Sequence, residues 1–224
     1  MSRFRQNGAR VGGLDVDSES LDQVELDARV VADLTVADGL SDAVDAACAS
    51  LSGLDVLVCC AGVVGLGTVA DTELHEWDRI FAVNVRGLYL AAQAAIPHLR
   101  ASGGGAIVNV ASQLGVVAVA NAAAYCASKG AAIQLTRAMA VDHAVDGIRV
   151  NAVSPGPTWT PLLEGFVVAS DDPAATRRAT EETMLHRRLI EAEEVAEAIA
   201  YMASPRAGST TGANLVVDGG YTIR

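Results

Sequence analysis

The sequence is poor in basic residues and almost devoid of lysine. Of its 224 residues only 16 are basic, and one of these is a lysine, Lys129; the formal net charge is −11. The basic residues occur singly or in pairs, so no basic stripe can follow a phosphate backbone. Nucleic acids and anionic membranes are therefore not expected partners.

Cysteines are few, and long apolar runs are missing. The four cysteines form no CxxC pair, and Cys59 and Cys60 are adjacent within an apolar run. We therefore expect buried thiols in a reducing compartment, with neither disulfides nor a zinc site. No apolar run approaches the roughly 20 residues of a membrane-spanning helix. The N-terminus also lacks the apolar core of a signal peptide, so we expect a cytoplasmic protein.

What is present is enough apolar sequence for one compact domain. Hydrophobic residues make up 51% of the chain and charged residues 19%, which is too apolar for disorder. No linker, repeat or low-complexity segment divides the sequence. We expect a single domain over residues 1–224.

Short apolar or β-branched runs alternate with stretches of helical spacing. The expected strands lie at 9–16, 28–34, 54–62, 105–112, 148–156 and 213–220. The expected helices lie near 36–51, 73–101, 122–145 and 191–203, with a less regular pair between 161 and 186. This alternation predicts an α/β fold with a doubly wound, Rossmann-like parallel sheet covered on both faces.

The residues with the clearest chemistry are Ser112, Tyr125 and Lys129. They are spaced S-x12-Y-x3-K, with the serine at the end of an expected strand and the other two on the next expected helix. An i, i+4 pair shares one helix face, so the phenol and the ammonium can point into the same space. A nearby ammonium favours the phenolate and is expected to lower the tyrosine pKa. A lone YxxxK pattern, however, also occurs on helices without catalytic function.

With its neighbouring motifs, the sequence resembles the short-chain dehydrogenase/reductase family. The resemblance runs from Gly8 almost to the end of the chain. It rests on CCAG (59–62), where the family usually has NNAG, on NVRG (84–87), on the Ser/Tyr/Lys set, on RVNAVSPGPTWT (149–160) and on VDGGYT (217–222).

The resemblance implies an oxidoreductase that moves a hydride between a nicotinamide cofactor and a secondary alcohol or ketone, without a metal. Tyr125 is then the general acid/base, Ser112 hydrogen-bonds the substrate oxygen, and Lys129 holds the nicotinamide ribose. Asn84 supports a water that links Lys129 to solvent. An asparagine inside a helix also often only caps or kinks it, and that reading of Asn84 stays open.

The resemblance also implies a set of cofactor contacts. They are Asp15, Asp33, Leu34, Cys60, Ala61, Gly62, Tyr125, Lys129, Pro155, Gly156 and Thr158. Asp15, at the end of a strand, favours NAD(H) over NADP(H), because a carboxylate binds ribose hydroxyls and repels a 2′-phosphate. The alternative interpretation of Asp15 is a surface aspartate that begins a turn. The segment at Pro155 to Thr158 is alternatively a plain strand-ending turn.

One family feature is missing from the sequence. The family opens with a strand and a TGxxxGxG turn that receives the pyrophosphate, whereas Gly8, Gly12 and Gly13 lie in and around what matches the second strand. The lost strand is central in the family order, so its neighbours are expected to lack a partner between them. Three explanations are open: a start internal to a longer product, omitted or rearranged residues, or a true truncation that has lost cofactor binding.

Substrate and assembly are the least determined by sequence. The segment 157–190 corresponds to the family's variable substrate lid, in which Trp159 either walls the pocket or packs under the lid. The runner-up activity is an NADPH-dependent 3-oxoacyl carrier-protein reductase, which the negative charge and Asp15 disfavour. A non-catalytic binding or oligomer partner of the same fold is the other alternative. Alanine-rich helices near 84–101 and 122–145, and the family resemblance, imply a homotetramer.

Overall fold

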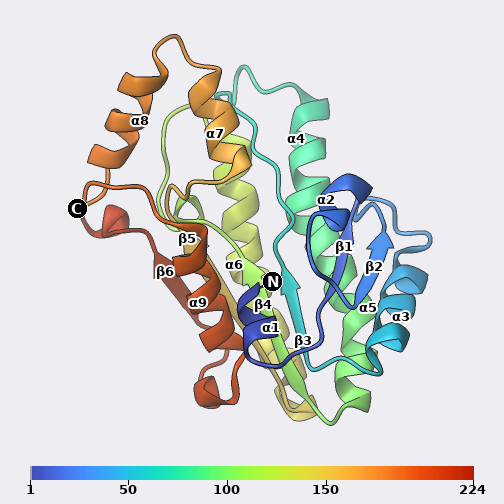
Figure 1. Cartoon of the computed structure of the whole chain (residues 1–224). Coiled ribbons are helices and arrows are strands. Elements are labelled where there is room, and N and C mark those ends of the chain that lie inside the picture. Colours follow the sequence, from blue (N-terminus) through green and yellow to red (C-terminus); the bar gives the residue numbers. More distant parts are fainter. Residues whose placement is uncertain (1) are drawn as a thin grey trace.

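A computed structural model describes residues 2–224 and has the expected parallel α/β architecture (Figure 1). The strands are β1 (Gly12–Asp15), β2 (Ala28–Val31), β3 (Val56–Cys59), β4 (Gly105–Val110), β5 (Ile148–Pro155) and β6 (Asn214–Val217). The α-helices are α1 (Ser2–Gln6), α2 (Ser18–Asp22), α3 (Leu40–Leu51), α4 (Leu74–Phe81), α5 (Leu88–Ala101), α6 (Ala123–His143), α7 (Pro161–Val168), α8 (Pro173–Glu182) and α9 (Ala192–Ala203). All strands expected from the sequence are present.

The strands form two separate parallel sheets. β1 pairs with β2, and β3, β4, β5 and β6 pair in that order. Within residues 2–224 no strand lies between β1 and β3 to join them. All four residues of β3 are only half-buried, although an inner strand of a doubly wound sheet is usually buried on both faces. The expectation that β1 and β3 have no strand between them is therefore confirmed for the described residues.

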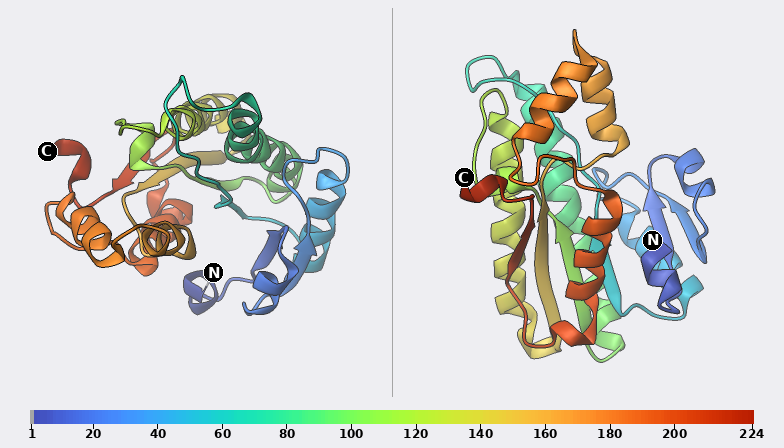
Figure 2. Two further views of the ribbon diagram at one scale, coloured as in Figure 1. Left: turned by 90° about the horizontal axis from the view of Figure 1, so that it is seen from above. Right: turned by 60° about the vertical axis from the view of Figure 1, so that its left-hand side comes forward.

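Helices cover both faces of the larger sheet, as the view from above in Figure 2 shows. On one face, α5 and α6 bury Leu99, Ala132 and Ile133 against Ile107 and Val150. On the other face, α9 packs with residues of the lid against β4 and β5. Helix α9 begins with the reciprocal capping box of Glu191 and Glu194, which satisfies two backbone N–H groups of the first turn.

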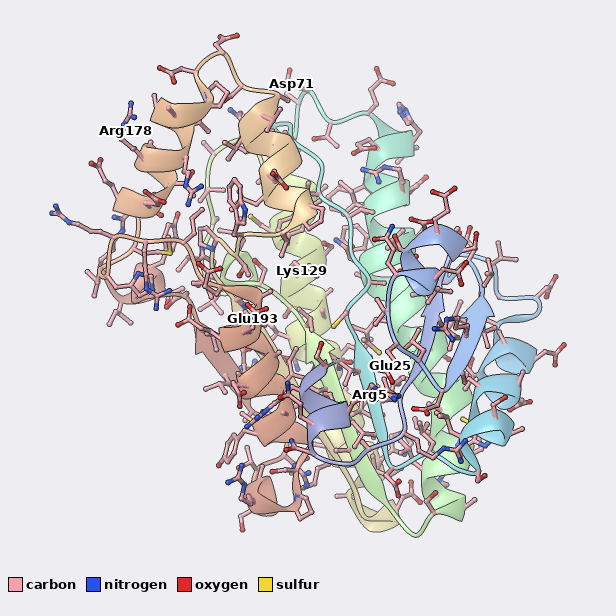
Figure 3. The ribbon with its side chains drawn as sticks, viewed as in Figure 1. Arg5, Glu25, Asp71, Lys129, Arg178 and Glu193 are labelled. Atoms are coloured by element: carbon pink, nitrogen blue, oxygen red, sulfur yellow. The ribbon has the colours of Figure 1, made fainter. Side chains whose placement is uncertain are left out.

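The β1–β2 pair is attached to the rest of the molecule by helices and charged contacts. Helix α3 packs on β1, β2 and α5. In Figure 3, Arg5 of α1 and Glu25 lie side by side, and Arg5 bonds Glu25 at 2.7 Å and Asp27 at 2.6 Å. Arg3 pairs with Glu197 of α9 at 2.8 Å. Helix α1 thereby connects the small sheet to the helix that covers the large one.

Helices α4 and α5 form one continuous run, joined by the π-helical turn η1 (Ala82–Gly87). By length and composition alone, Leu74–Ala101 is apolar enough to cross a membrane, which corrects the expectation that no stretch reaches that length. The run packs against α3, α6 and β3, as a core helix of a compact domain does, and Asn84 is buried in its middle.

Candidate active site

The expected catalytic residues gather at the carboxyl ends of the parallel strands. Ser112 follows β4, and Tyr125 and Lys129 lie one turn apart in the first half of α6. In Figure 3, Lys129 is labelled near the middle of the view, on α6. Ligands of open α/β sheets bind at this edge. The structure therefore brings the Ser/Tyr/Lys set together, as the spacing predicts.

Lys129 is a charged group in the core, only 4% exposed. Its Nζ donates a hydrogen bond of 3.1 Å to the carbonyl of Val110, the last residue of β4. Nζ also lies 5.8 Å from the centroid of the Tyr125 ring. Burial lowers the pKa of Lys129 to about 8, because the ammonium loses hydration that the single carbonyl does not replace; the nearby Cys60 thiol offsets part of this.

Tyr125 corrects one expectation about the electrostatics of the site. Burial raises the pKa of Tyr125, and the Ser112 hydroxyl offsets only part of that effect. The expected lowering by the Lys129 ammonium is therefore wrong for the protein without ligands. The desolvation of the half-buried phenol is the larger effect, so Tyr125 is a neutral phenol at neutral pH.

Ser112 stands directly before the short helix η2 (Gln113–Gly115). Its backbone is extended, and its hydroxyl accepts a hydrogen bond of 3.1 Å from the Leu114 amide. This bond leaves the hydroxyl proton free to donate, as the role implied for Ser112 requires. The side chain is 8% exposed, so its orientation is set by the fold.

Asn84 is 2% exposed and makes a closed set of hydrogen bonds. Its Oδ1 accepts from the Val63 amide at 2.8 Å, and its Nδ2 donates to the Val63 carbonyl at 2.9 Å. Nδ2 also donates to the hydroxyl of Ser128 at 3.0 Å. The π-helical turn around it is a feature that recurs at functional sites. Asn84 therefore holds the loop after β3 against α6.

Two glycines allow the backbone to pack closely against these groups. A Cβ on Gly62 would lie 3.2 Å from Lys129 Nζ and 3.4 Å from Asn84 Oδ1. A Cβ on Gly156 would lie 2.8 Å from Gln113 Oε1 and from the Cα of Asp218. Only glycine fits at the second position, and the first keeps the backbone open beside the lysine. Both glycines belong to the set of cofactor contacts that the family resemblance implies, and that role stays a prediction.

The turn after β5 is fixed by its own contacts. Thr158 Oγ1 donates to the Gly156 carbonyl at 2.9 Å, and the Ile190 amide donates to the Pro157 carbonyl at 3.0 Å. Trp159 packs with the residues under the lid, and the Arg177 guanidinium of α8 lies 4.6 Å from its ring centroid. Of the two readings of Trp159, the structure shows packing under the lid.

The adenosine-side residues lie around the small sheet and the end of β3. Asp15 ends β1, is exposed, and accepts from the Asp17 amide at 3.0 Å through Oδ1. Asp33 accepts from the Thr35 amide at 2.8 Å, and that bond lowers its pKa. Leu34 packs against Gly87. Between the β1–β2 pair and β3, residues 2–224 supply no glycine-rich turn for a pyrophosphate.

Cysteine placement corrects a second expectation. All four cysteines are free, as expected, but only Cys48 is fully buried and Cys60 is exposed. Cys60 follows β3, whose outer edge has no partner strand among the described residues. The same open edge therefore explains both the exposed thiol and the half-buried strand.

Ser128 is a site residue that the sequence reasoning missed. It is fully buried, and its hydroxyl donates to the Tyr125 carbonyl at 2.8 Å while accepting from Asn84. The signal was its position three residues after Tyr125, which puts it on the same helix face as the tyrosine. A hydroxyl on a buried helix face needs a partner.

Comparisons with known proteins show the family of the chain. A family model described as enoyl-(acyl carrier protein) reductase matches residues 2–222. The chain is 36% identical to 2-(R)-hydroxypropyl-CoM dehydrogenase of Xanthobacter autotrophicus (strain ATCC BAA-1158 / Py2), over 99% of this chain and 92% of the relative. It is 43% identical to cyclopentanol dehydrogenase of Comamonas sp. (strain NCIMB 9872), over 85% of this chain and 74% of the relative.

A solved structure shows the same fold. Ligand-free aldohexose dehydrogenase of Thermoplasma acidophilum superposes with a TM-score of 0.93 at 32% identity, covering all of this chain and 88% of the other. The chain therefore belongs to the short-chain dehydrogenase/reductase family, whose dehydrogenases use nicotinamide cofactors, and it is an oxidoreductase that acts on CH–OH groups.

Proposed function

We propose that the protein transfers a hydride between NAD(H) and a secondary alcohol or ketone, with Tyr125 as the general acid/base. The observation that carries this proposal is the buried ammonium of Lys129 beside the Tyr125 ring, with the Ser112 hydroxyl next to Tyr125. A lysine this buried is costly to keep. Stabilising the phenolate of Tyr125 with a positive charge is a function that accounts for keeping Lys129 at this position.

The proposed mechanism assigns proton handling to this chain's own residues. Ser112 Oγ donates a hydrogen bond to the substrate oxygen, and Tyr125 Oη takes the proton of the alcohol or returns it to the ketone. Lys129 stabilises the phenolate, and its Nζ, with Gly62 and Gly156, holds the nicotinamide end of the cofactor. The cofactor, when bound, accepts or gives the hydride. The raised tyrosine pKa favours the phenol, so oxidation is expected to speed up as pH rises towards 8, the range in which Lys129 keeps its positive charge.

The proposal is tested by titrating the chain with NADH and assaying NAD⁺ reduction with a panel of secondary alcohols that includes cyclopentanol. We expect saturable binding and alcohol-dependent formation of NADH. A relative named cyclopentanol dehydrogenase makes cyclic secondary alcohols the first choice. If the chain shows no NADH binding and no turnover, a non-catalytic binding or oligomer partner of the same fold is favoured instead. The open edge between β1 and β3 is the observation that supports this alternative.

Asp15 is proposed to select NAD(H). The Asp15→Ser variant lacks the carboxylate that repels a 2′-phosphate. Its preference for NAD⁺ over NADP⁺, measured as the ratio of the two kcat/KM values, is therefore expected to fall by roughly 10-fold. Asp22→Ser is the matched control, since Asp22 is 79% exposed on the neighbouring helix α2. A change below twofold in the Asp15 variant would leave the aspartate as a surface residue that begins a turn.

We further propose a cytoplasmic homotetramer that binds a small-molecule alcohol and neither nucleic acid nor membrane. An open hollow of about 910 Å³ lies on the surface of α4, η1, α5 and α6. Its apolar lining is Phe81, Val85, Tyr89 and Leu135, with charged residues of α4 and η1 beside them. Tyr89 is exposed and the other three apolar side chains are half-buried, and an apolar hollow of this kind favours contact with another copy. Light scattering of the purified chain is expected to give four times the 23.0 kDa chain mass.

A further inference from the structure

The buried hydroxyl of Ser128 joins two residues of the proposed site. Its proton is donated to the Tyr125 carbonyl at 2.8 Å, and its oxygen accepts from Asn84 Nδ2 at 3.0 Å. A hydroxyl has one proton to give. Because that proton is used within α6, Asn84 must present its NH₂ group to Ser128.

The rest of the Asn84 amide is committed to the loop after β3. One Nδ2 proton goes to the Val63 carbonyl at 2.9 Å, and Oδ1 accepts from the Val63 amide at 2.8 Å. Both protons of the NH₂ group are therefore used, one on the loop and one on Ser128. The contacts form an unbroken chain from Val63 through Asn84 and Ser128 to Tyr125.

This chain of contacts ends beside the lysine. Gly62 precedes Val63, and a Cβ at Gly62 would lie 3.2 Å from Lys129 Nζ and 3.4 Å from Asn84 Oδ1. The loop, the asparagine and the ammonium thus border one small space. A shift of α6 relative to the loop would change the place of Lys129 in that space and the direction of Tyr125 together.

We propose that Ser128 is a positioning residue that sets the register of α6 against the loop at Gly62 and Val63. It acts on Tyr125 and Lys129 through the backbone and through Asn84. This inference rests on the function proposed for Tyr125. Without the hydroxyl, one Nδ2 proton of Asn84 is left buried and unpaired, and the first half of α6 loses its link to the loop.

The test is Ser128→Ala, assayed with cyclopentanol and NAD⁺. We expect kcat to fall by roughly 10- to 100-fold, because a small misplacement of reacting groups is costly in rate, with KM for the alcohol changed less than about twofold, because Ser128 does not contact the substrate. Ser128→Cys carries the same expectation, since a thiol is a weak donor, and it replaces the alanine variant if that variant does not fold.

Thr136→Val is the matched control on the same helix. Thr136 is 1% exposed, accepts from Asn109 Nδ2 at 2.9 Å and donates to the Ala132 carbonyl at 2.8 Å. It thus repeats the Ser128 arrangement two turns away from the site. We expect a similar loss of stability in both variants but an unchanged kcat in Thr136→Val. Equal loss of kcat in both would make Ser128 merely structural.

A second readout does not need activity. Lys129 is the sole lysine, so ¹³C-lysine labelling gives one side-chain signal to titrate by NMR. Ser128→Ala is expected to raise the Lys129 midpoint by roughly 0.5 unit, because a looser contact lets water reach the ammonium, and Thr136→Val is expected to leave it unchanged. An unaltered midpoint together with a kcat within twofold of the original protein overturns the inference.

The failure of this inference differs from failure of the proposed function. If Tyr125→Phe keeps full activity, the function assigned to Tyr125 fails, and the Lys129 midpoint alone decides the role of Ser128. If Tyr125→Phe is inactive while Ser128→Ala matches the original protein in both readouts, only the inference about Ser128 is wrong.

Discussion

Tyr125→Phe is expected to lower kcat/KM for alcohol oxidation by about 10³-fold, since a positioned acid/base contributes 10²- to 10⁴-fold. Phenylalanine keeps the ring over which Lys129 Nζ lies at 5.8 Å and removes only the hydroxyl. The half-buried packing of the residue is therefore kept. The measurement is steady-state NADH formation with cyclopentanol at saturating NAD⁺.

Tyr201→Phe provides the control for this substitution. Tyr201 is 43% exposed on α9, so its variant is expected to keep the full rate. If Tyr125→Phe also keeps the full rate, the proton-transfer role of Tyr125 is removed. The activity of the chain would then come from other residues.

Lys129→Met is expected to have two opposite effects: loss of activity and a gain in stability at pH 7. Activity falls because no cation remains to stabilise the phenolate or to hold the nicotinamide end. Stability rises because methionine fills the space without a buried charge. The pKa of Lys129 is lowered from 10.5 to about 8, which corresponds to an upper limit of roughly 3 kcal/mol.

The pH dependence of stability gives the sign of this effect. Below pH 8 the folded protein carries the full cost of the buried ammonium, while the unfolded chain does not. Between pH 8 and pH 10.5 the folded protein has released the proton and the unfolded chain still binds it, so stability attributable to Lys129 rises with pH. Thermal unfolding of the methionine variant should lack this rise.

The stability prediction for Lys129→Met is measured by the melting temperature at pH 7. A chain of this size gains about 2–4 °C in Tm per kcal/mol, so the variant is expected to melt several degrees higher. A lower Tm would show that the hydrogen bond to the Val110 carbonyl outweighs desolvation. That result would contradict the pKa assigned to the lysine.

The sequence predicts the strands and the long helices because their apolar periods are clear. Strand β4 (Gly105–Val110) and helix α6 (Ala123–His143) lie within the ranges expected from those periods. Helices α1 and α2 have five residues each, which is too short for a period to show. Their helical form depends on contacts that the sequence does not state, such as that of Arg5 with Glu25.

The open sheet could be predicted, but its attachment could not. The absence of a glycine-rich turn before Gly12 predicts that β1 and β3 lack a strand between them, as the structure shows. How β1 and β2 are held depends on α3, which packs on α5. Such packing between distant segments leaves no local pattern in the sequence.

For the site too, the sequence predicts the local arrangement but not the effects of distant contacts. Spacing places Ser112, Tyr125 and Lys129 together, because strand ends and helix faces have fixed geometry. The raised pKa of Tyr125 could not be predicted, because desolvation depends on the whole surrounding structure. The link from Ser128 to Asn84 spans 44 residues, and a pairing over that separation needs the fold.

The most direct test of the account is the titration of its single lysine. With ¹³C-lysine labelling, the side-chain signal of Lys129 is followed by NMR from pH 6 to pH 11 in the ligand-free protein. The account predicts a midpoint of about 8, as expected for an ammonium buried beside Tyr125. A midpoint at the ordinary value of 10.5 would place the ammonium in water and would contradict the proposed site.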